Sequence, residues 1–448
     1  MKAWRLLIVF LAVSSLVLGG SSPLHAAKTV EERLAELEQE MQLLKRQLEV
    51  EKEVQVKKDT ETSVLVAGQD GFNVKSKDGS FQLKFRGQVQ TDERFFINDD
   101  SSGGSNTFLL RRVRPTLEGT VFKYFDFRLM PDFGGGNTVL QDAWVDFKYW
   151  KAAQLRVGKF KSPVGLERLQ SDPSAQFIET ALSTNLVPNR DIGADLHGEL
   201  FDGALTYDLG VFNGVTDNGS WDGDIHDDKE FAGRIFALPF KNSNNDYLNG
   251  LGIGIGTSAG TAHGSTLPTY RSGGQQSIFS YSPAAGTVLA DGPRLRLAPQ
   301  AYYYFGPFGV LTEFVFNSQE VVKGVSSDTL KNRGWQIAAN YVITGENAAY
   351  TGVVPRYAFD PKNRKWGALE AAARFSALTI DKDTFPNFSN PLSSIRDARA
   401  WTIGLNWYLN RNLKFMTHFE ETFFDGGFAD GGDRDIEHAL LSRMQLYF

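Results

Sequence analysis

Apolar and polar residues alternate with a period of two along most of the chain, from about residue 80 to the C-terminus. In the first such segment Leu83, Phe85 and Val89 share one face, whereas Lys84 and Arg86 share the other. Successive side chains of a β-strand point to opposite faces, so this alternation predicts strands with one apolar and one polar face. About sixteen such segments are present, most of them roughly ten or more residues long, which suits strands that cross a membrane. They span residues 80–97, 107–121, 123–133, 138–149, 153–160, 191–201, 204–213, 229–240, 248–259, 293–305, 308–320, 330–344, 365–380, 397–410, 412–424 and 435–448.

The links between the predicted strands alternate between short and long. Short links such as 123–124 and 410–412 fall at every second junction, and longer links rich in Gly, Asp and Ser lie between them. The long links span 98–106, 161–190, 214–228, 260–292, 381–396 and 425–434. One junction that should be short, residues 344–364, breaks this rule. Short turns at one end of the strands and long loops at the other are typical of a transmembrane β-barrel.

A closed barrel is also what the chemistry of lipid requires. Lipid offers no hydrogen bonds to the backbone, so strands can span it only when the sheet closes on itself. We therefore predict an all-β fold over residues 80–448, a sixteen-stranded antiparallel transmembrane β-barrel. The apolar face of each strand then contacts lipid, and the polar face lines a water-filled interior.

A different periodicity precedes the strands. Val30, Leu34, Leu37, Met41, Leu44 and Leu48 are spaced four and three residues apart in turn, with charged residues between them. This heptad spacing predicts a short N-terminal α-helical coiled coil over residues 28–58, in the periplasm, followed by a linker over residues 59–79. We favour self-association of this helix. A single amphipathic helix that packs on its own domain remains the alternative.

The first residues have the features of an export signal. Lys2 and Arg5 precede the apolar run Leu6–Leu18, and small residues follow before Lys28. This pattern predicts a signal peptide over residues 1–27, cleaved after Ala26 or Ala27. The chain ends on an aromatic residue, as most barrels of the bacterial outer membrane do. We expect the protein to reside in that membrane.

Composition excludes several classes of protein. The 448 residues include no cysteine, which excludes disulfides, thiolate metal sites and cysteine nucleophiles. The formal charge of −6 argues against nucleic acid as a partner. The glycine-rich stretch 252–256 has no helix after it, so it does not predict a dinucleotide site, and we expect no enzyme activity, cofactor or metal site. The acidic loop 222–228 could hold Ca²⁺, although a solvated loop is the favoured interpretation.

Arginines recur on the polar faces of the predicted strands. Those placed in the lumen are Arg86, Arg112, Arg114, Arg128, Arg156, Arg294, Arg296, Arg374 and Arg443, and they outnumber the acidic candidates Glu118, Asp126, Asp142, Asp146 and Glu370. Guanidinium groups suit phosphate-like or carboxylate oxyanions, and rings of charged side chains set the sign of a permeating ion. For each arginine, a structural pairing with a lumen carboxylate is the competing interpretation.

Four motifs in the chain resemble a known family. They are Phe108–Gly119, Arg156–Arg168, Tyr341–Glu346 and Thr402–Tyr408, and they occur in the order found in the phosphate-selective porin O and P family. The resemblance implies a homotrimer of sixteen-stranded porins whose third loop, here about residues 161–190, folds inward to narrow the pore.

The resemblance also implies particular constriction residues. Asp142, Arg168 and Ser171 match positions of the family's anion site, and Arg111 and Arg112 match its arginine pair. Two basic positions of the family are not kept: one aligns with Asp126 and the other with Ser183 or Thr184.

The predicted function is that of an outer-membrane porin for the passive diffusion of small solutes. An anion preference, for phosphate or similar oxyanions, is favoured. A structural anchor with a coiled-coil tether and a non-selective general porin remain alternatives. The expected partners are outer-membrane lipids, small anionic solutes and two further copies of the chain.

Overall fold

The computed structural model describes residues 29–61, 63–97, 104–224, 227–281 and 287–448. The signal peptide predicted for residues 1–27 lies outside this range. The chain divides into two compact units, Met1–Glu61 and Thr62–Phe448.

The described part of the first unit is one helix, α1 (Val30–Glu61). It begins at the residue where the heptad pattern starts and runs slightly beyond the coiled-coil segment expected from the sequence. The six apolar residues of the heptad are each more than half exposed within the single chain. Among the described residues, no helix is both long enough and apolar enough to cross a membrane.

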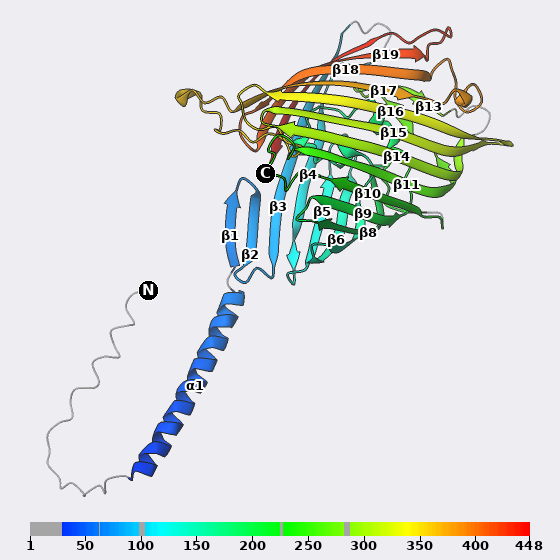
Figure 1. The fold of residues 1–448 in the computed structure, drawn as a ribbon. Coiled ribbons are helices and arrows are strands. Elements are labelled where there is room, and N and C mark those ends of the chain that lie inside the picture. The colour runs from blue at the N-terminus through cyan, green and yellow to red at the C-terminus, as the bar shows by residue number, and fades with distance from the viewer. Residues whose placement is uncertain (1–28, 62, 98–103, 225–226, 282–286) are drawn as a thin grey trace. The chain divides into compact units, whose positions relative to one another are not determined.

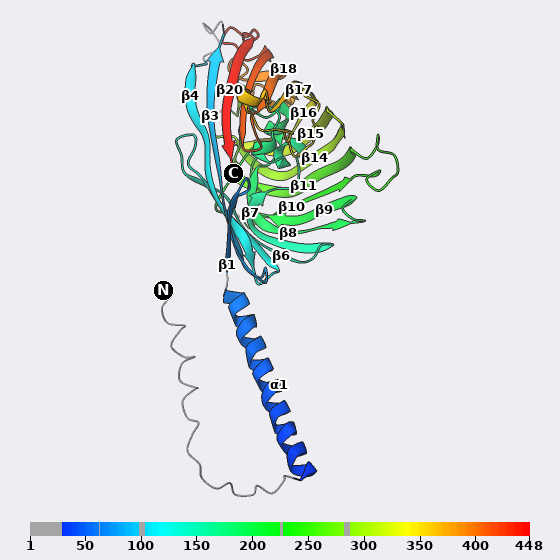
Figure 2. The same ribbon diagram turned by 90° about the vertical axis from the view of Figure 1, so that its left-hand side faces the viewer.

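The second unit is a closed antiparallel barrel, and the predicted sixteen strands are confirmed (Figure 1). The strands of its wall are β3 (Gln82–Phe96), β4 (Thr107–Val121), β5 (Phe125–Asp132), β6 (Val139–Trp150), β7 (Ala153–Lys161), β8 (Arg190–Leu200), β9 (Leu205–Phe212), β10 (Glu230–Ala237), β11 (Leu251–Thr266), β14 (Leu289–Phe305), β15 (Phe308–Lys323), β16 (Ser326–Val342), β17 (Ala368–Thr379), β18 (Ile395–Tyr408), β19 (Leu413–Gly426) and β20 (Glu437–Tyr447). Each strand pairs with the next, and β20 pairs with β3, opposite residues 88–96, to close the wall (Figure 2).

Polarity across the wall is the reverse of that in a water-soluble domain. On β3 the inward side chains of Gln90 and Asp92 are fully buried, whereas the outward Val89 is 37 % exposed. At the end of the strands with short links, Tyr149 contacts both Tyr124 and Trp150, with ring centroids 4.7 and 4.8 Å apart. These rings are placed as in the aromatic girdle of a membrane barrel.

One side of the barrel interior is filled by inward-folded segments. The third loop, residues 162–189, contains a short helix α2 (Leu166–Leu169) and two 3₁₀ turns, η1 (Asp172–Ser174) and η2 (Leu182–Leu186). A small hairpin, β12 (Thr269–Arg271) and β13 (Ser277–Ser280), lies within the link from β11 to β14. Residues of η2 and of this hairpin pack with inward side chains of β14, β15, β17 and β18 in one apolar cluster. From the alternation of polar and apolar residues we expect a polar interior throughout. The structure differs because these loops bring their own apolar surface inside.

The long link between β16 and β17 supports the third loop from the opposite end of the barrel. The hydroxyl of Tyr350 donates to the carbonyl oxygen of Leu166 at 2.6 Å. The amide of Gln170 donates to the carbonyl oxygen of Tyr350 at 2.7 Å. These contacts account for the one junction that breaks the predicted alternation of link lengths.

Residues assigned to a linker from the sequence form a hairpin instead. Strands β1 (Ser63–Gly68) and β2 (Gly71–Ser76) pair with each other, and β2 also pairs with β3 from Phe72 opposite Phe85 to Lys75 opposite Gln82. The hairpin therefore covers the part of the β3 edge that β20 leaves open. The physical reason is hydrogen bonding, because a bare strand edge leaves backbone groups without partners.

Candidate functional site

The third loop enters the barrel immediately after β7 and is anchored by carboxylates. Glu313 of β15 accepts a hydrogen bond from the amide of Leu166 at 2.6 Å. Glu167 accepts from the amide of Ala181 at 2.9 Å and forms an ion pair with Arg374 at 3.0 Å. Close approach to the wall is possible because Gly256 faces the loop, where a Cβ atom would lie 2.1 Å from the carbonyl oxygen of Val164.

Glu179, between the two 3₁₀ turns, anchors the third loop to three arginines of the wall. Its carboxylate lies 2.9 Å from Arg111, 3.1 Å from Arg94 and 3.8 Å from Arg443. Burial opposes ionisation of this group, but the arginines, Arg111 above all, outweigh it and hold the pKa of Glu179 well below its usual range. Ion pairs of Glu167 and Glu179 therefore hold the loop to the wall at two points.

The open side of the interior contains two cavities, one on each side of the third loop. The turn-side chamber, about 490 Å³, lies toward the strand ends joined by short links and includes Arg86, Arg128 and Tyr447 in its lining. The loop-side chamber, about 320 Å³, lies toward the long loops and includes Arg111, Arg112 and Glu179. The described lining of each chamber carries seven basic and four acidic residues, so both surround a solute with an excess of positive charge.

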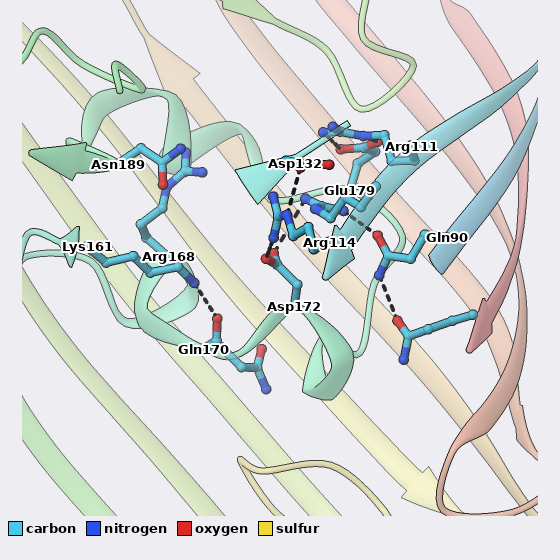
Figure 3. Close-up of polar contacts among 12 residues, drawn as sticks. Gln90, Arg111, Arg114, Asp132, Lys161, Arg168, Gln170, Asp172, Glu179 and Asn189 are labelled. Carbon is cyan, nitrogen blue, oxygen red and sulfur yellow. Dashed lines mark hydrogen bonds and ion pairs between the residues drawn. The ribbon is translucent and has the colours of Figure 1, made fainter. Parts of the chain in front are cut away.

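Four residues line both chambers and therefore define the constriction: Arg114 of β4, Lys161 at the end of β7, Asp172 of the third loop, and Arg190 at the start of β8. Figure 3 shows Arg114 between Asp132 and Asp172, with Lys161 directed to the loop backbone. The Nε atom of Arg114 lies 2.7 Å from the carboxylate of Asp132, and its Nη1 atom contacts Asp172. The residues that the two chambers share are thus three basic side chains and one carboxylate.

Most basic residues of the two chamber linings have a neighbouring carboxylate, but three of the described ones do not. Arg190 pairs with Asp142 at 2.7 Å. Lys161 donates to the carbonyl oxygen of Gln170 at 2.7 Å, and Arg168 donates to Asn218 and to the carbonyl oxygen of Thr184. Within the described part of the chain, neither Lys161 nor Arg168 has a carboxylate within 4 Å, and Arg234 of the turn-side chamber donates to the side-chain oxygen of Gln300 instead.

Charge states at the loop follow from this arrangement. Burial lowers the pKa of Arg168 to about 10, which leaves the guanidinium protonated at neutral pH. Burial disfavours the ionised form of Asp172, but the charges of Arg112 and Arg114 outweigh it and hold the pKa of this carboxyl well below its usual range. The third loop therefore presents ionised groups of both signs to the loop-side chamber.

Most residues predicted from the sequence do line the chambers. Those in the turn-side chamber are Arg86, Arg114, Arg128, Asp142, Arg156 and Ser171, and those in the loop-side chamber are Arg111, Arg112, Arg114 and Arg168. Several of these arginines form ion pairs with carboxylates: Arg86 and Arg128 both pair with Glu118, and Arg156 lies 2.7 Å from Asp146.

Arg294 and Arg296, expected to line the pore, line neither chamber. Arg296 is fully buried and lies 2.7 Å from both Asp217 and Glu230, and Arg294 also pairs with Glu230. Asp217 belongs to the link between β9 and β10, which covers this part of the wall from inside. An inward direction on a strand does not guarantee access to water when a loop lies above the side chain.

Four functional candidates were not predicted: Lys161, Asp172, Arg190 and Arg234. Arg234 lines the turn-side chamber and shares the inward face of β10 with Ala232 and Phe236, so the alternation contained the signal for it. Lys161 and Arg190 flank the third loop, just beyond the predicted strand ends. Asp172 depends on the path of the loop, for which the sequence carries no periodic signal.

A closed antiparallel barrel with a polar, loop-narrowed interior defines an outer-membrane porin. Comparison with known families matches residues 81–448 to the family described as phosphate-selective porin O and P. The chain belongs to this family, and the protein is a bacterial outer-membrane channel rather than an enzyme.

Individual relatives are distant in sequence. The chain is 22% identical to Porin O of Pseudomonas aeruginosa over 418 residues, which cover 86% of this chain and 92% of that protein. Its fold is similar to that of the outer-membrane channel DcaP of Acinetobacter baumannii, with a TM-score of 0.55 and 12% identity over 86% of this chain and 100% of the other. The anion-selective porin from Comamonas acidovorans gives a TM-score of 0.51 and 12% identity over 82% of this chain and 100% of that one.

Proposed function

We propose that this porin conducts small solutes by passive diffusion and prefers anions, with phosphate or similar oxyanions as the favoured class. The observation that carries the proposal is the lining of the two chambers, each with seven basic and four acidic residues, together with Lys161 between them, which has no carboxylate partner among the described residues. The family's description as phosphate-selective and the anion-selective porin from Comamonas acidovorans agree with this assignment.

The electrostatic interaction between charged side chains and a permeating ion is strong in a narrow passage, because the two come within a few ångströms of each other. Two unit charges 4 Å apart interact with about 4 kcal/mol at an effective dielectric of about 20, so a protonated lysine without a carboxylate partner strongly repels a cation at this distance. Guanidinium groups lie on both sides of the constriction, and each presents several N–H donors in a fixed plane. A permeating oxyanion can therefore bind to those on one side and then to those on the other. An anion therefore finds successive binding positions, whereas a cation meets repulsion.

Conduction of phosphate by the purified protein tests the proposal against its alternatives. In planar bilayers bathed in potassium phosphate, we expect discrete channels whose conductance saturates as the phosphate concentration rises, because the anion occupies the constriction. Folded protein without conductance would support a structural anchor. A conductance that rises in proportion to the salt, with no preference between ions, would support a general porin. Either result would reject the proposal.

We also propose that the chain assembles as a homotrimer and that α1 contributes a periplasmic coiled coil. The support is the apolar stripe of the helix, whose six residues are each more than half exposed in the single chain. A stripe with this spacing is buried when helices supercoil around one another.

Substitutions in the stripe should weaken the assembly. We expect Leu37→Asp combined with Leu44→Asp to lower the temperature at which the detergent-extracted oligomer dissociates, because each aspartate would be buried in the seam. Gln39→Asp with Arg46→Asp, on the opposite side of the helix, provides a control that should leave this temperature unchanged. An equal effect of the two pairs, or a full-length protein that is monomeric by native mass spectrometry, would contradict the proposal.

A further inference from the structure

Asp172 occupies an unusual position among the acidic residues of the pore. It is the one carboxylate that the described linings of the two chambers share. One of its oxygens contacts Nη1 of Arg114, and the other lies 3.4 Å from Nη2 of Arg112. Lys161 and Arg190 are the next cations that act on it. Its side chain is 22% exposed, compared with 5% for Arg114, so a solute can reach the carboxylate.

The cations around Asp172 offer more donors than its two oxygens can use. The Nε atoms of Arg112 and Arg168 are buried and have no hydrogen-bond partner. Each guanidinium has five N–H donors, whereas a carboxylate accepts mainly in its own plane. A tetrahedral oxyanion accepts in three dimensions and would satisfy donors that Asp172 leaves open.

The backbone on both sides of Asp172 is fixed. Lys161 holds the carbonyl oxygen of Gln170, and Lys414 and Gln445 donate to the carbonyl oxygen of Pro173 at 3.2 and 3.1 Å. A change at this point of the loop is therefore a rotation of the Asp172 side chain and does not require the loop to move.

We propose that Asp172 is a tethered competitor, whose carboxylate occupies the anion position of the constriction until a permeating phosphate-like oxyanion displaces it. This inference rests on the proposed anion preference and explains how an anion that binds at the constriction can leave it again. Conduction requires that an ion bind well enough to enter and weakly enough to leave. A carboxylate tethered to the loop meets both requirements. It compensates the buried arginines while no anion is bound, and it competes with a bound anion for them, which helps the anion to leave.

Removal of the carboxylate charge tests the inference. With the full-length protein in planar bilayers and inorganic phosphate as the probe, Asp172→Asn should reach half-saturation at a roughly tenfold lower phosphate concentration, with a lower plateau conductance. Asp172→Glu keeps the competing charge and should stay close to the wild-type protein. Asp425→Asn removes an exposed carboxylate that lines neither chamber and pairs only with the exposed Arg396 among the described residues, and it should leave the half-saturation concentration unchanged.

The outcomes separate this inference from the proposed function. The inference is wrong if the wild-type channel prefers anions but Asp172→Asn leaves the half-saturation concentration unchanged. It is also wrong if this variant raises the conductance of anions and cations alike. Either result would mean that Asp172 only stabilises the position of the loop. If the wild-type channel shows no anion preference, the proposed function is rejected first. Heat-modifiable electrophoresis reports folding of each variant, and Asp172→Ser carries the same prediction should the asparagine variant fail to fold.

Discussion

Lys161→Glu should reverse the preference of the channel from anions to cations. The substitution replaces a basic side chain with a carboxylate at a residue that lines both chambers and lacks a carboxylate partner among the described residues. We expect the anion-to-cation permeability ratio to fall at least about tenfold, which corresponds to roughly 1.4 kcal/mol and is small beside the interaction of two close charges. Reversal potentials in a potassium chloride gradient measure this ratio directly.

Lys151→Glu is the matched control for this substitution. Lys151 is an exposed residue of the short turn between β6 and β7, where salt screens its charge from the constriction. The control variant should keep the wild-type permeability ratio to within about twofold. Equal shifts in the two variants would mean that overall charge, and not the constriction, sets the selectivity.

Arg374→Leu should release the third loop without unfolding the barrel. Arg374 is almost fully buried, lies 3.0 Å from Glu167 and 3.3 Å from Glu420, and packs 4.4 Å from the ring centroid of Phe177. Removing one partner of such a buried pair costs about 3–5 kcal/mol, because the remaining carboxylates stay buried without compensation. We expect single channels with larger and noisier conductance, and cleavage within the loop by added protease.

Arg396→Leu offers the corresponding test at the surface. Arg396 pairs with Asp425 at 3.3 Å, but both side chains are more than half exposed. Exposed pairs contribute about 0–1 kcal/mol, so this variant should conduct like the wild-type channel. An Arg374→Leu channel indistinguishable from it would contradict the assigned role of the buried cluster.

The fold was accessible from the sequence because membrane strands impose a simple rule on their residues. Lipid outside and water inside require strict alternation, and Leu83, Arg86 and Val89 follow it. The same rule placed Arg86, Arg114 and Arg128 at the turn-side chamber, because the polar faces of β3, β4 and β5 border it.

The rule does not extend to segments inside the barrel. Arg294 and Arg296 follow the alternation, but the link between β9 and β10 covers them and separates them from the chambers. This burial depends on contacts between residues far apart in the sequence, such as that of Arg296 with Asp217. The position of Asp172 likewise depends on Glu313 and Arg374, which lie more than 140 residues away along the chain. The hairpin of β1 and β2 is a different case. Short apolar runs on either side of Gln69, Asp70 and Gly71 did contain a strand signal.

The central claim is that the constriction favours anions, and the reversal potential of the wild-type channel tests it most directly. With potassium chloride more concentrated on one side of the bilayer, the account predicts a potential of the sign that chloride sets. A potential near zero would contradict the anion preference, and a potential of the sign set by potassium would contradict the account as a whole.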